Sequence, residues 1–193
     1  MKRKIAVLLS GSGTNAKNIC SYFKGHPAIE VALLISNKEQ SGARAIGEAF
    51  HIPSSIFNKE NFYHSEEVLQ TLKKHQIDAI VLAGFLWMIP ENLLLEYPDR
   101  IINIHPALLP KYGGKGMHGM HVHDTVYNNR EKESGITVHL CNEKYDEGKI
   151  LFQQKVGLTE TDTPETIARK VQELEHLYYP KIIETYLSGS DFN

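Results

Sequence analysis

Residues 5–15 have the sequence Ile-Ala-Val-Leu-Leu-Ser-Gly-Ser-Gly-Thr-Asn, and this stretch decides the fold. The apolar run at 5–9 is typical of a strand buried on both faces. The glycine-rich residues 11–15 predict a tight turn, and apolar side chains then recur at helical spacing over residues 16–23. A second apolar run at 31–35 completes a strand–helix–strand unit, whose crossover should be right-handed.

The same alternation of strands and helices continues along the first half of the chain. The pattern predicts helices over 42–50 and 59–74, and buried strands over 79–82 and 101–104. Strands that alternate with helices indicate an α/β fold with an open, mostly parallel, Rossmann-like sheet and helices on both of its faces.

The second half of the chain changes character. Apolar and polar residues alternate over 136–140, which predicts a half-exposed strand, and another strand begins at 150–152. We expect these strands to be antiparallel additions to the sheet. A last helix should begin near Thr163 and Pro164, because a capping residue is followed there by proline at the first helical position. Pro180 should kink or interrupt this helix.

Composition limits the classes of protein that fit. The 193 residues carry 21 Lys and Arg against 23 Asp and Glu, so overall basic character does not indicate a nucleic-acid partner. The apolar run near the N-terminus is too short for a signal sequence or a membrane span, which favours the cytoplasm and no membrane partner. Cys20 and Cys141 are far apart and are expected to be reduced thiols.

The glycine turn is a candidate anion site. A turn between a strand and a helix presents backbone N–H groups at the positive end of the helix dipole, which suits phosphate. The spacing matches neither a full dinucleotide fingerprint nor a P-loop, so a plain tight turn is the alternative. The candidate residues are Gly11, Ser12, Gly13, Thr14 and Asn15.

A second candidate site lies at the end of the strand that precedes Pro106. Asn103 and His105 point to the same side of this strand because side chains alternate along it. Their position is the carboxyl edge of the sheet, where open α/β folds bind ligands. Asn103 offers an amide donor for a developing oxyanion, and His105 offers a group for proton transfer. A hydrogen-bonded pair that closes the strand is the alternative.

Asp146 is the natural third member of this group. It lies in the glycine-containing turn at 145–148, and beside His105 its carboxylate would favour the charged imidazole. The alternative is that Asp146 only shapes the turn. No serine or cysteine occupies a nucleophile-elbow motif, so a covalent acyl-enzyme is not expected.

The residues at 103–112, Asn-Ile-His-Pro-Ala-Leu-Leu-Pro-Lys-Tyr, resemble the signature of the folate-dependent formyltransferases. The 11–15 turn, residues 81–85, residues 146–148 and the residues at 175–180 extend this similarity over nearly the whole chain. Within the family, the chain resembles the enzymes that formylate phosphoribosylglycinamide in purine synthesis.

The resemblance implies a reaction and its participants. The formyl group of 10-formyltetrahydrofolate, a co-substrate, would pass to the amine of 5-phosphoribosylglycinamide by direct attack, without a metal. Protonated His105 and Asn103 would stabilise the oxyanion, while Asp146 would keep the imidazole charged. The partners would be these small molecules, and the protein would be a monomer or a homodimer. One domain over 1–193 is expected, with a phosphate-binding half at 1–100 and a catalytic and folate-binding half at 101–193.

The resemblance also assigns binding residues. The 11–15 turn would hold the substrate phosphate, and Glu175 would contact the glycinamide end. The folate would contact Lys59, Leu86, Trp87, Met88, Ile89, Asn103, Asn142, Glu143, Lys144 and Tyr145.

This chain departs from the family at two places. Trp87 stands where the family often has arginine, so a charge contact is lost there, and the match at Lys59 is loose. Residues 114–120 are an insertion beside the active edge; they could contact substrate, close as a lid or pack against another subunit.

Three alternatives remain. His118, His121 and His123, with Asp124, could form a metal site, although a solvated or substrate-facing loop is favoured. A sugar N-formyltransferase would use the same catalytic group. A non-catalytic nucleotide-binding module would need only the glycine turn.

Overall fold

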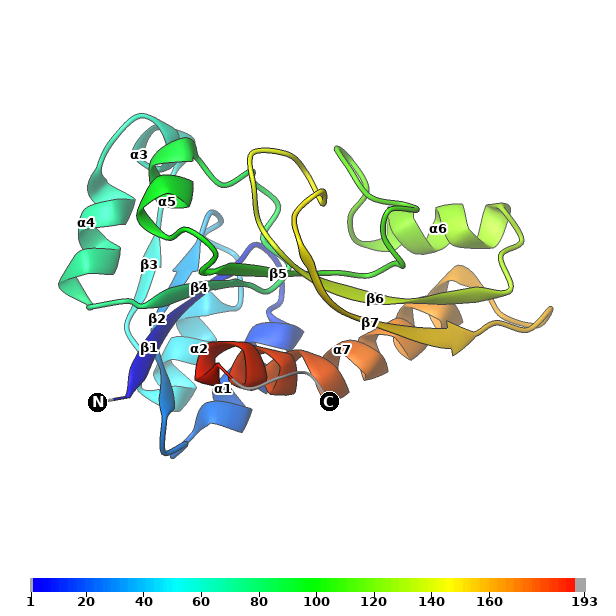
Figure 1. The fold of residues 1–193 in the computed structure, drawn as a ribbon, viewed down its shortest axis with the longest axis horizontal. Helices are drawn as coiled ribbons and strands as arrows, with labels where there is room; N and C mark the ends of the chain where they lie inside the picture. The colour runs from blue at the N-terminus through cyan, green and yellow to red at the C-terminus, as the bar shows by residue number, and fades with distance from the viewer. Residues whose placement is uncertain (1, 190–193) are drawn as a thin grey trace.

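One seven-stranded sheet organises the molecule, in the order β3-β2-β1-β4-β5-β6-β7 (Figure 1). A computed structural model describes residues 2–189. Neighbouring strands from β3 to β5 are parallel, whereas β5–β6 and β6–β7 are antiparallel. The α/β fold with a mostly parallel sheet and added antiparallel strands is therefore confirmed. The strands are β1 (Arg3–Leu9), β2 (Ile29–Ser36), β3 (Ser54–Ile56), β4 (Ala79–Leu82), β5 (Ile101–His105), β6 (Glu133–Leu140) and β7 (Ile150–Gly157).

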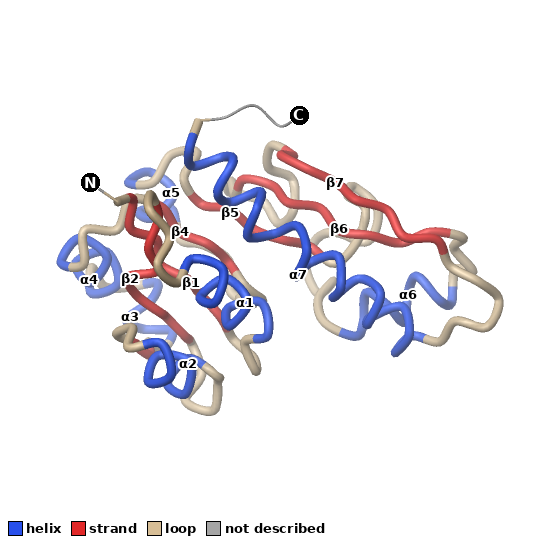
Figure 2. Tube along the Cα trace, turned by 90° about the horizontal axis from the view of Figure 1, so that it is seen from below, coloured by secondary structure: helices blue, strands red, loops and turns tan. Residues whose placement is uncertain are grey.

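Helices cover both faces of the sheet, as the sequence predicts (Figures 1 and 2). One face packs against α1 (Thr14–Phe23), α2 (Ala43–Phe50) and α7 (Pro164–Ser188). The opposite face packs against α3 (Lys59–Tyr63), α4 (Glu67–Lys74) and α5 (Glu91–Glu96). The remaining helix, α6 (Met120–Asn128), lies near the start of β6 and contacts α7. The central strand β1 is consequently buried on both sides.

The helix expected over 59–74 is two helices, so that prediction was wrong. Asn58 caps α3 by accepting the N–H of Asn61 at 2.8 Å. The hydroxyl of Ser65 then donates to the Asn61 carbonyl and accepts the N–H of Glu67. Because serine competes in this way for the backbone groups of a helix, it ends α3 and starts α4.

The strand over 136–140 was expected to be half-exposed, and that prediction was wrong because the strand is buried on both faces. Thr137 and His139 are the polar members of the alternation, and these residues are only 0% and 2% exposed. The Thr137 hydroxyl donates to the Ala107 carbonyl at 2.7 Å and accepts the N–H of Leu109. The segment after β5 thus covers the face that the sequence pattern indicated to be open to water.

The last helix begins as predicted but is not interrupted at Pro180. The Thr163 side chain caps α7 by accepting the N–H of Thr166, and Pro164 follows at the first helical position. The helix continues through Pro180 to Ser188. Proline cannot donate to the carbonyl four residues earlier, that of His176, and the side-chain amide of Asn18 donates to this carbonyl at 2.8 Å instead.

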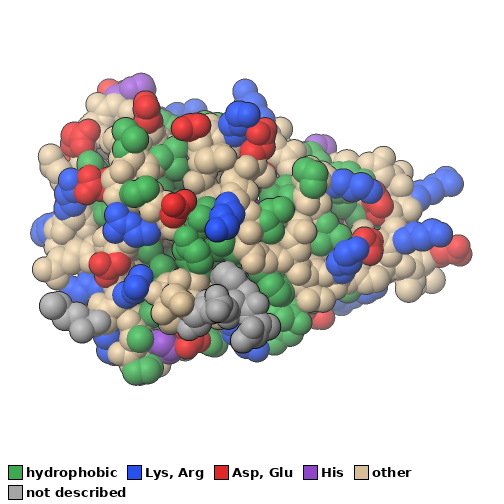
Figure 3. Space-filling view, viewed as in Figure 1, with side chains coloured by type: hydrophobic (Ala, Val, Ile, Leu, Met, Phe, Trp, Pro, Cys, Tyr) green, Lys and Arg blue, Asp and Glu red, His purple; other side chains and the backbone are tan. Residues whose placement is uncertain are grey.

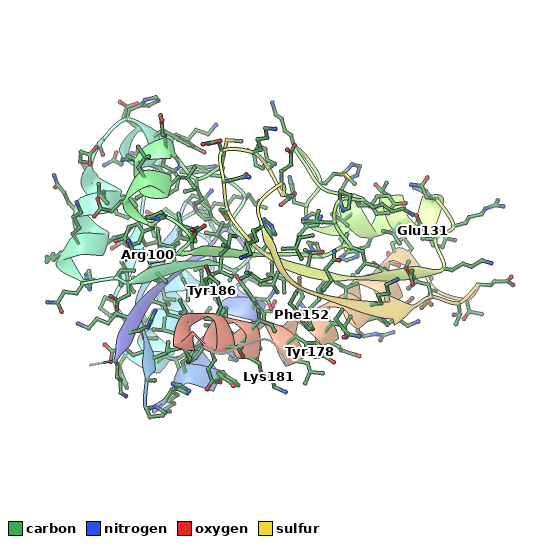
Figure 4. The ribbon with its side chains drawn as sticks, viewed as in Figure 1. Arg100, Glu131, Phe152, Tyr178, Lys181 and Tyr186 are labelled. Carbon is green, nitrogen blue, oxygen red and sulfur yellow. The ribbon has the colours of Figure 1, made fainter. Side chains whose placement is uncertain are left out.

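Helix α7 is tied to the sheet along its length (Figures 2 and 4). The hydroxyl of the fully buried Tyr179 lies 2.9 Å from the Leu82 carbonyl oxygen and 3.0 Å from that of Ile102, so it reaches both β4 and β5. The ring of Tyr178 packs beside that of Phe152 on β7, with 5.1 Å between centroids. Near the end of the helix, Tyr186 donates to the Asp99 carbonyl.

Positive and negative side chains are interspersed on the face seen in Figure 3. Over residues 2–189, the structure contains no helix that is both long and apolar enough to cross a membrane.

Candidate active site

A cavity of about 820 Å³ opens at the carboxyl ends of β4 and β5. Its walls come from the turn after β1, the 84–89 segment, the end of β5, the 114–120 loop, the 141–146 turn and α7. The volume falls within the range of small-molecule sites, roughly 300–1,000 Å³. Most of the residues that the sequence singled out therefore line one space.

The structure brings Asn103, His105 and Asp146 together at this cavity. Asp146 Oδ2 lies 3.5 Å from His105 Nδ1, and Asp146 Oδ1 lies 3.5 Å from Nε2 of His139. The Asn103 amide nitrogen lies 3.1 Å from the same His139 nitrogen. Two strands and one turn, remote in sequence, thus place an amide, two imidazoles and a carboxylate in contact.

The tautomer of His105 follows from its neighbours. Its Nε2 lies 2.7 Å from the Tyr112 carbonyl oxygen, which can only accept, so Nε2 carries the proton. Burial lowers the pKa of His105 below its ordinary value, against the opposing effects of the Asp146 carboxylate and the Tyr112 carbonyl. Asp146 thus acts in the expected direction, but burial outweighs it and favours the neutral ring with its lone pair on Nδ1.

Asp146 is held as an anion. Burial alone would raise its pKa, but the nearby His139 and His105 rings and the backbone N–H of Gly114 together hold the pKa below its usual range. The Gly114 N–H donates to Oδ2 at 2.9 Å. Asp146 has a φ of 56°, a left-handed conformation that non-glycine residues adopt with strain. The turn is therefore shaped around its carboxylate.

Sequence reasoning missed His139. Its Nδ1 lies 2.9 Å from the Leu140 carbonyl oxygen, so Nδ1 is the protonated nitrogen of the neutral ring and Nε2 accepts from the Asn103 amide. Antiparallel pairing places Asn103 directly opposite His139. The alternation of residues 136–140 was a usable signal, but the register that aligns them with β5 cannot be read from the sequence.

The phosphate-binding candidates divide into two groups. Ser12 and Asn15 line the cavity, whereas Gly11, Gly13 and Thr14 shape the turn behind it. Gly13 has a φ of 80° at the start of α1.

Glu175 also lines the cavity, and the Asn15 amide donates to it at 2.8 Å. Burial raises the pKa of Glu175, although the hydrogen bond from Asn15 opposes that shift. A partly buried carboxylate thus lies beside the turn that is the candidate phosphate site.

The folate-binding candidates also divide. Residues 86–89, Asn142, Lys144 and Tyr145 line the cavity, but Lys59 and Glu143 are not part of its wall. Trp87 packs in an aromatic group with Phe62, Tyr63 and Phe85, with ring centroids 5.3 to 6.1 Å apart. Phe85 and Trp87 line the cavity, so this side of it presents an aromatic wall.

The 114–120 loop contributes to the cavity wall along its length. Among the neighbouring histidines, His118 and His121 are exposed, whereas His123 on α6 is buried and lines the cavity. Within residues 2–189, no three His, Cys, Asp or Glu side chains are grouped as metal ligands.

Burial raises the pKa of the Cys141 thiol, which also lines the cavity, to about 12, so this thiol stays protonated and is a poor nucleophile at neutral pH.

Comparisons with known proteins identify the family of this chain. A family model described as "Formyl transferase" matches residues 3–183, and the chain belongs to this family. A chloroplastic phosphoribosylglycinamide formyltransferase of Arabidopsis thaliana is 39% identical over 190 residues, which cover 94% of this chain and 64% of that protein. The Bacillus subtilis phosphoribosylglycinamide formyltransferase is 36% identical, with 96% of this chain and 95% of that protein covered. A crystal structure of phosphoribosylglycinamide formyltransferase from Bacillus halodurans superposes with a TM-score of 0.85 at 37% identity, covering 96% of each chain.

Proposed function

We propose that this protein transfers the formyl group of 10-formyltetrahydrofolate to the amine of 5-phosphoribosylglycinamide, a step of purine biosynthesis. The observation that carries the proposal is the shared cavity. Asn103, His105 and Asp146 form one part of its wall, and the carboxylate of Glu175 lies beside the glycine turn in another. A formyl group placed at the first group and a phosphorylated amine placed at the second would meet in the same space.

The attack begins from the neutral amine. An α-amino group has a reference pKa of about 8, so a useful fraction is unprotonated at pH 7. The amine nitrogen bonds to the formyl carbon, and the carbonyl electrons move onto its oxygen. The Asn103 amide uses one N–H for His139 and has a second for this oxyanion. No covalent bond to the protein is needed.

Proton transfer then completes the reaction. The lone pair on His105 Nδ1 accepts the proton that the attacking nitrogen releases, and the resulting imidazolium pairs with Asp146. The oxyanion electrons return, the bond from carbon to the folate nitrogen breaks, and that nitrogen takes the proton from His105. The resemblance implies a His105 imidazole that is already charged before the attack. We propose instead that His105 gains its charge during the reaction, because burial lowers its pKa.

The donor and acceptor are assigned to different walls. The folate would lie along residues 86–89 and 142–145, against the aromatic group that includes Trp87. The phosphate would lie at Ser12 and Asn15, within the 1–100 half, while residues 101–193 supply the catalytic group. We also propose that the protein is one domain and a monomer or a homodimer, and that its partners are small molecules, without nucleic acid, membrane or metal.

The compartment is proposed as the cytoplasm. The Arabidopsis relative is named as chloroplastic. Fractionation of the producing cells tests this point.

A panel of acceptors tests the proposed substrate. The purified protein is incubated with 10-formyltetrahydrofolate and, in separate reactions, with phosphoribosylglycinamide, its form without the phosphate, or a phosphorylated amino sugar. Product masses report the transfer. We expect kcat/KM to be highest for phosphoribosylglycinamide; preference for the amino sugar would favour a sugar N-formyltransferase, and absence of any transfer would favour a binding module.

A further inference from the structure

Helices α1 and α7 lie side by side and are joined by a series of polar contacts (Figure 2). The Gln172 amide donates to the Thr14 hydroxyl at 3.2 Å, and the Asn15 amide donates to Glu175 at 2.8 Å. One turn further along α1, the Asn18 amide donates to the His176 carbonyl at 2.8 Å. These contacts connect the helix that follows the glycine turn with the helix that carries Glu175.

The contact of Asn18 depends on a proline. In an uninterrupted helix, the His176 carbonyl would accept the N–H of residue 180, and Pro180 has no N–H to give. This carbonyl is therefore free to accept from a neighbouring helix, and Asn18 supplies the donor. A sequence feature that weakens α7 by itself thus creates an acceptor at one defined point on its surface.

We propose that Asn18 and Pro180 are positioning residues for Glu175. The carbonyl that Pro180 frees belongs to the residue directly after Glu175, so docking Asn18 there fixes where the Glu175 carboxylate meets Asn15 at the cavity wall. This inference rests on the proposed function, in which Glu175 contacts the glycinamide end of the acceptor. Neither Asn18 nor Pro180 lines the cavity.

A double-mutant cycle tests the contact without any substrate. Asn18→Ala leaves the His176 carbonyl without its donor, so we expect the midpoint of thermal unfolding to fall by about 5 °C. In Pro180→Ala protein, the new N–H of residue 180 can bond this carbonyl within α7, and adding Asn18→Ala should then lower the midpoint by less than half as much. Lys17→Ala, an exposed change in the same helix, is the control.

Kinetics separate positioning from mere stability. We expect Asn18→Ala to raise the KM for phosphoribosylglycinamide about fivefold or more, with the KM for the formyl donor unchanged. The double variant should regain thermal stability but keep the raised KM, because Asn18 still no longer docks. Equal thermal effects in both backgrounds, or an unaltered KM for the acceptor, would overturn the inference. Wild-type protein that fails to formylate the acceptor would instead contradict the proposed function, while the thermal cycle would still be readable.

Discussion

Asp146 is surrounded by donors and by groups that can become cations. The Gly114 N–H donates to it, and His105 and His139 lie 3.5 Å from its two oxygens. A carboxylate in this setting remains ionised and can balance a positive charge that forms on His105 during proton transfer. The role that we propose for Asp146 is therefore electrostatic, and it needs the charge rather than the shape of the side chain.

Asp146→Asn tests that role. The shape is retained and the charge is lost, so we expect the fold to persist and kcat to fall by about 100-fold, the effect of losing one strong electrostatic contact of about 3 kcal/mol. Steady-state kinetics and thermal unfolding measure the two properties. Glu147→Gln removes the neighbouring exposed charge and should leave kcat within twofold. Near-normal turnover by Asp146→Asn would remove Asp146 from the mechanism.

The titration of His105 provides an independent test. Burial lowers its pKa, and Asp146 opposes this shift. We expect NMR to give a midpoint below 6.5 in the wild-type protein and a still lower midpoint in Asp146→Asn, because a negative charge that favours the imidazolium has been removed. The unfolded chain then binds a proton more readily than the folded protein, so His105 makes the free energy of unfolding fall as the pH drops below about 6.5. A midpoint that rises in Asp146→Asn would contradict this account.

At the scale of the elements, the turn from β1 into α1 is fixed by packing. A Cβ on Gly13 would lie 2.7 Å from both Leu9 Cδ1 and Ile46 Cδ1, and φ there is 80°. The N–H of Gly42 donates to the Gly11 carbonyl at 3.0 Å, which ties the turn to the start of α2. The backbone groups of a candidate phosphate site are thereby held in place before any ligand arrives.

Gly13→Ala should reveal this constraint. We expect the free energy of unfolding to fall by about 1–3 kcal/mol, since the added methyl group crowds two core side chains and the backbone is left-handed. Denaturant unfolding measures the change. Gly11→Ala is the matched control, because among the described residues other than its two chain neighbours no heavy atom lies within 4 Å of its added Cβ. Equal effects of the two substitutions would show that packing at Gly13 is not limiting.

Strand and helix positions were largely predictable, because the periodicity of buried side chains reports them directly. The errors arose where a local polar group or a distant segment decided the outcome. Ser65 divides the helix expected over 59–74 by bonding backbone groups on either side. The burial of residues 136–140 depends on the segment at 107–109, which covers the strand from elsewhere in the chain. Neither effect alters hydrophobic periodicity.

At the scale of the whole molecule, Tyr179 connects the last helix with the centre of the sheet. Its hydroxyl lies near the carbonyls of Leu82 and Ile102, and Ile102 immediately precedes Asn103. A residue near the C-terminus is thus packed directly beneath the strand that carries the catalytic candidates. Such long-range contacts are invisible in the sequence pattern, as is the pairing that places His139 beside Asn103.

Tyr179→Phe removes only this hydroxyl. The two buried carbonyls share the single proton of this hydroxyl and lose it, so we expect the free energy of unfolding to fall by about 1–3 kcal/mol, measured by denaturant titration. Tyr178→Phe is the control, since it preserves the ring that packs on Phe152 and should change stability by less than about 0.5 kcal/mol. If Tyr179→Phe is as stable as the wild type, the hydroxyl does not hold α7 to the sheet.

The most direct test of the central claim follows the formyl carbon itself. A single turnover is run with 10-formyltetrahydrofolate labelled with ¹³C at the formyl carbon, together with phosphoribosylglycinamide, and the label is located by NMR and by mass measurement of the protein. The account predicts that the label moves from the folate nitrogen to the amine nitrogen of the acceptor, with none bound to the protein at any time. Label recovered on the protein, or recovered only as free formate, would contradict direct transfer in this cavity.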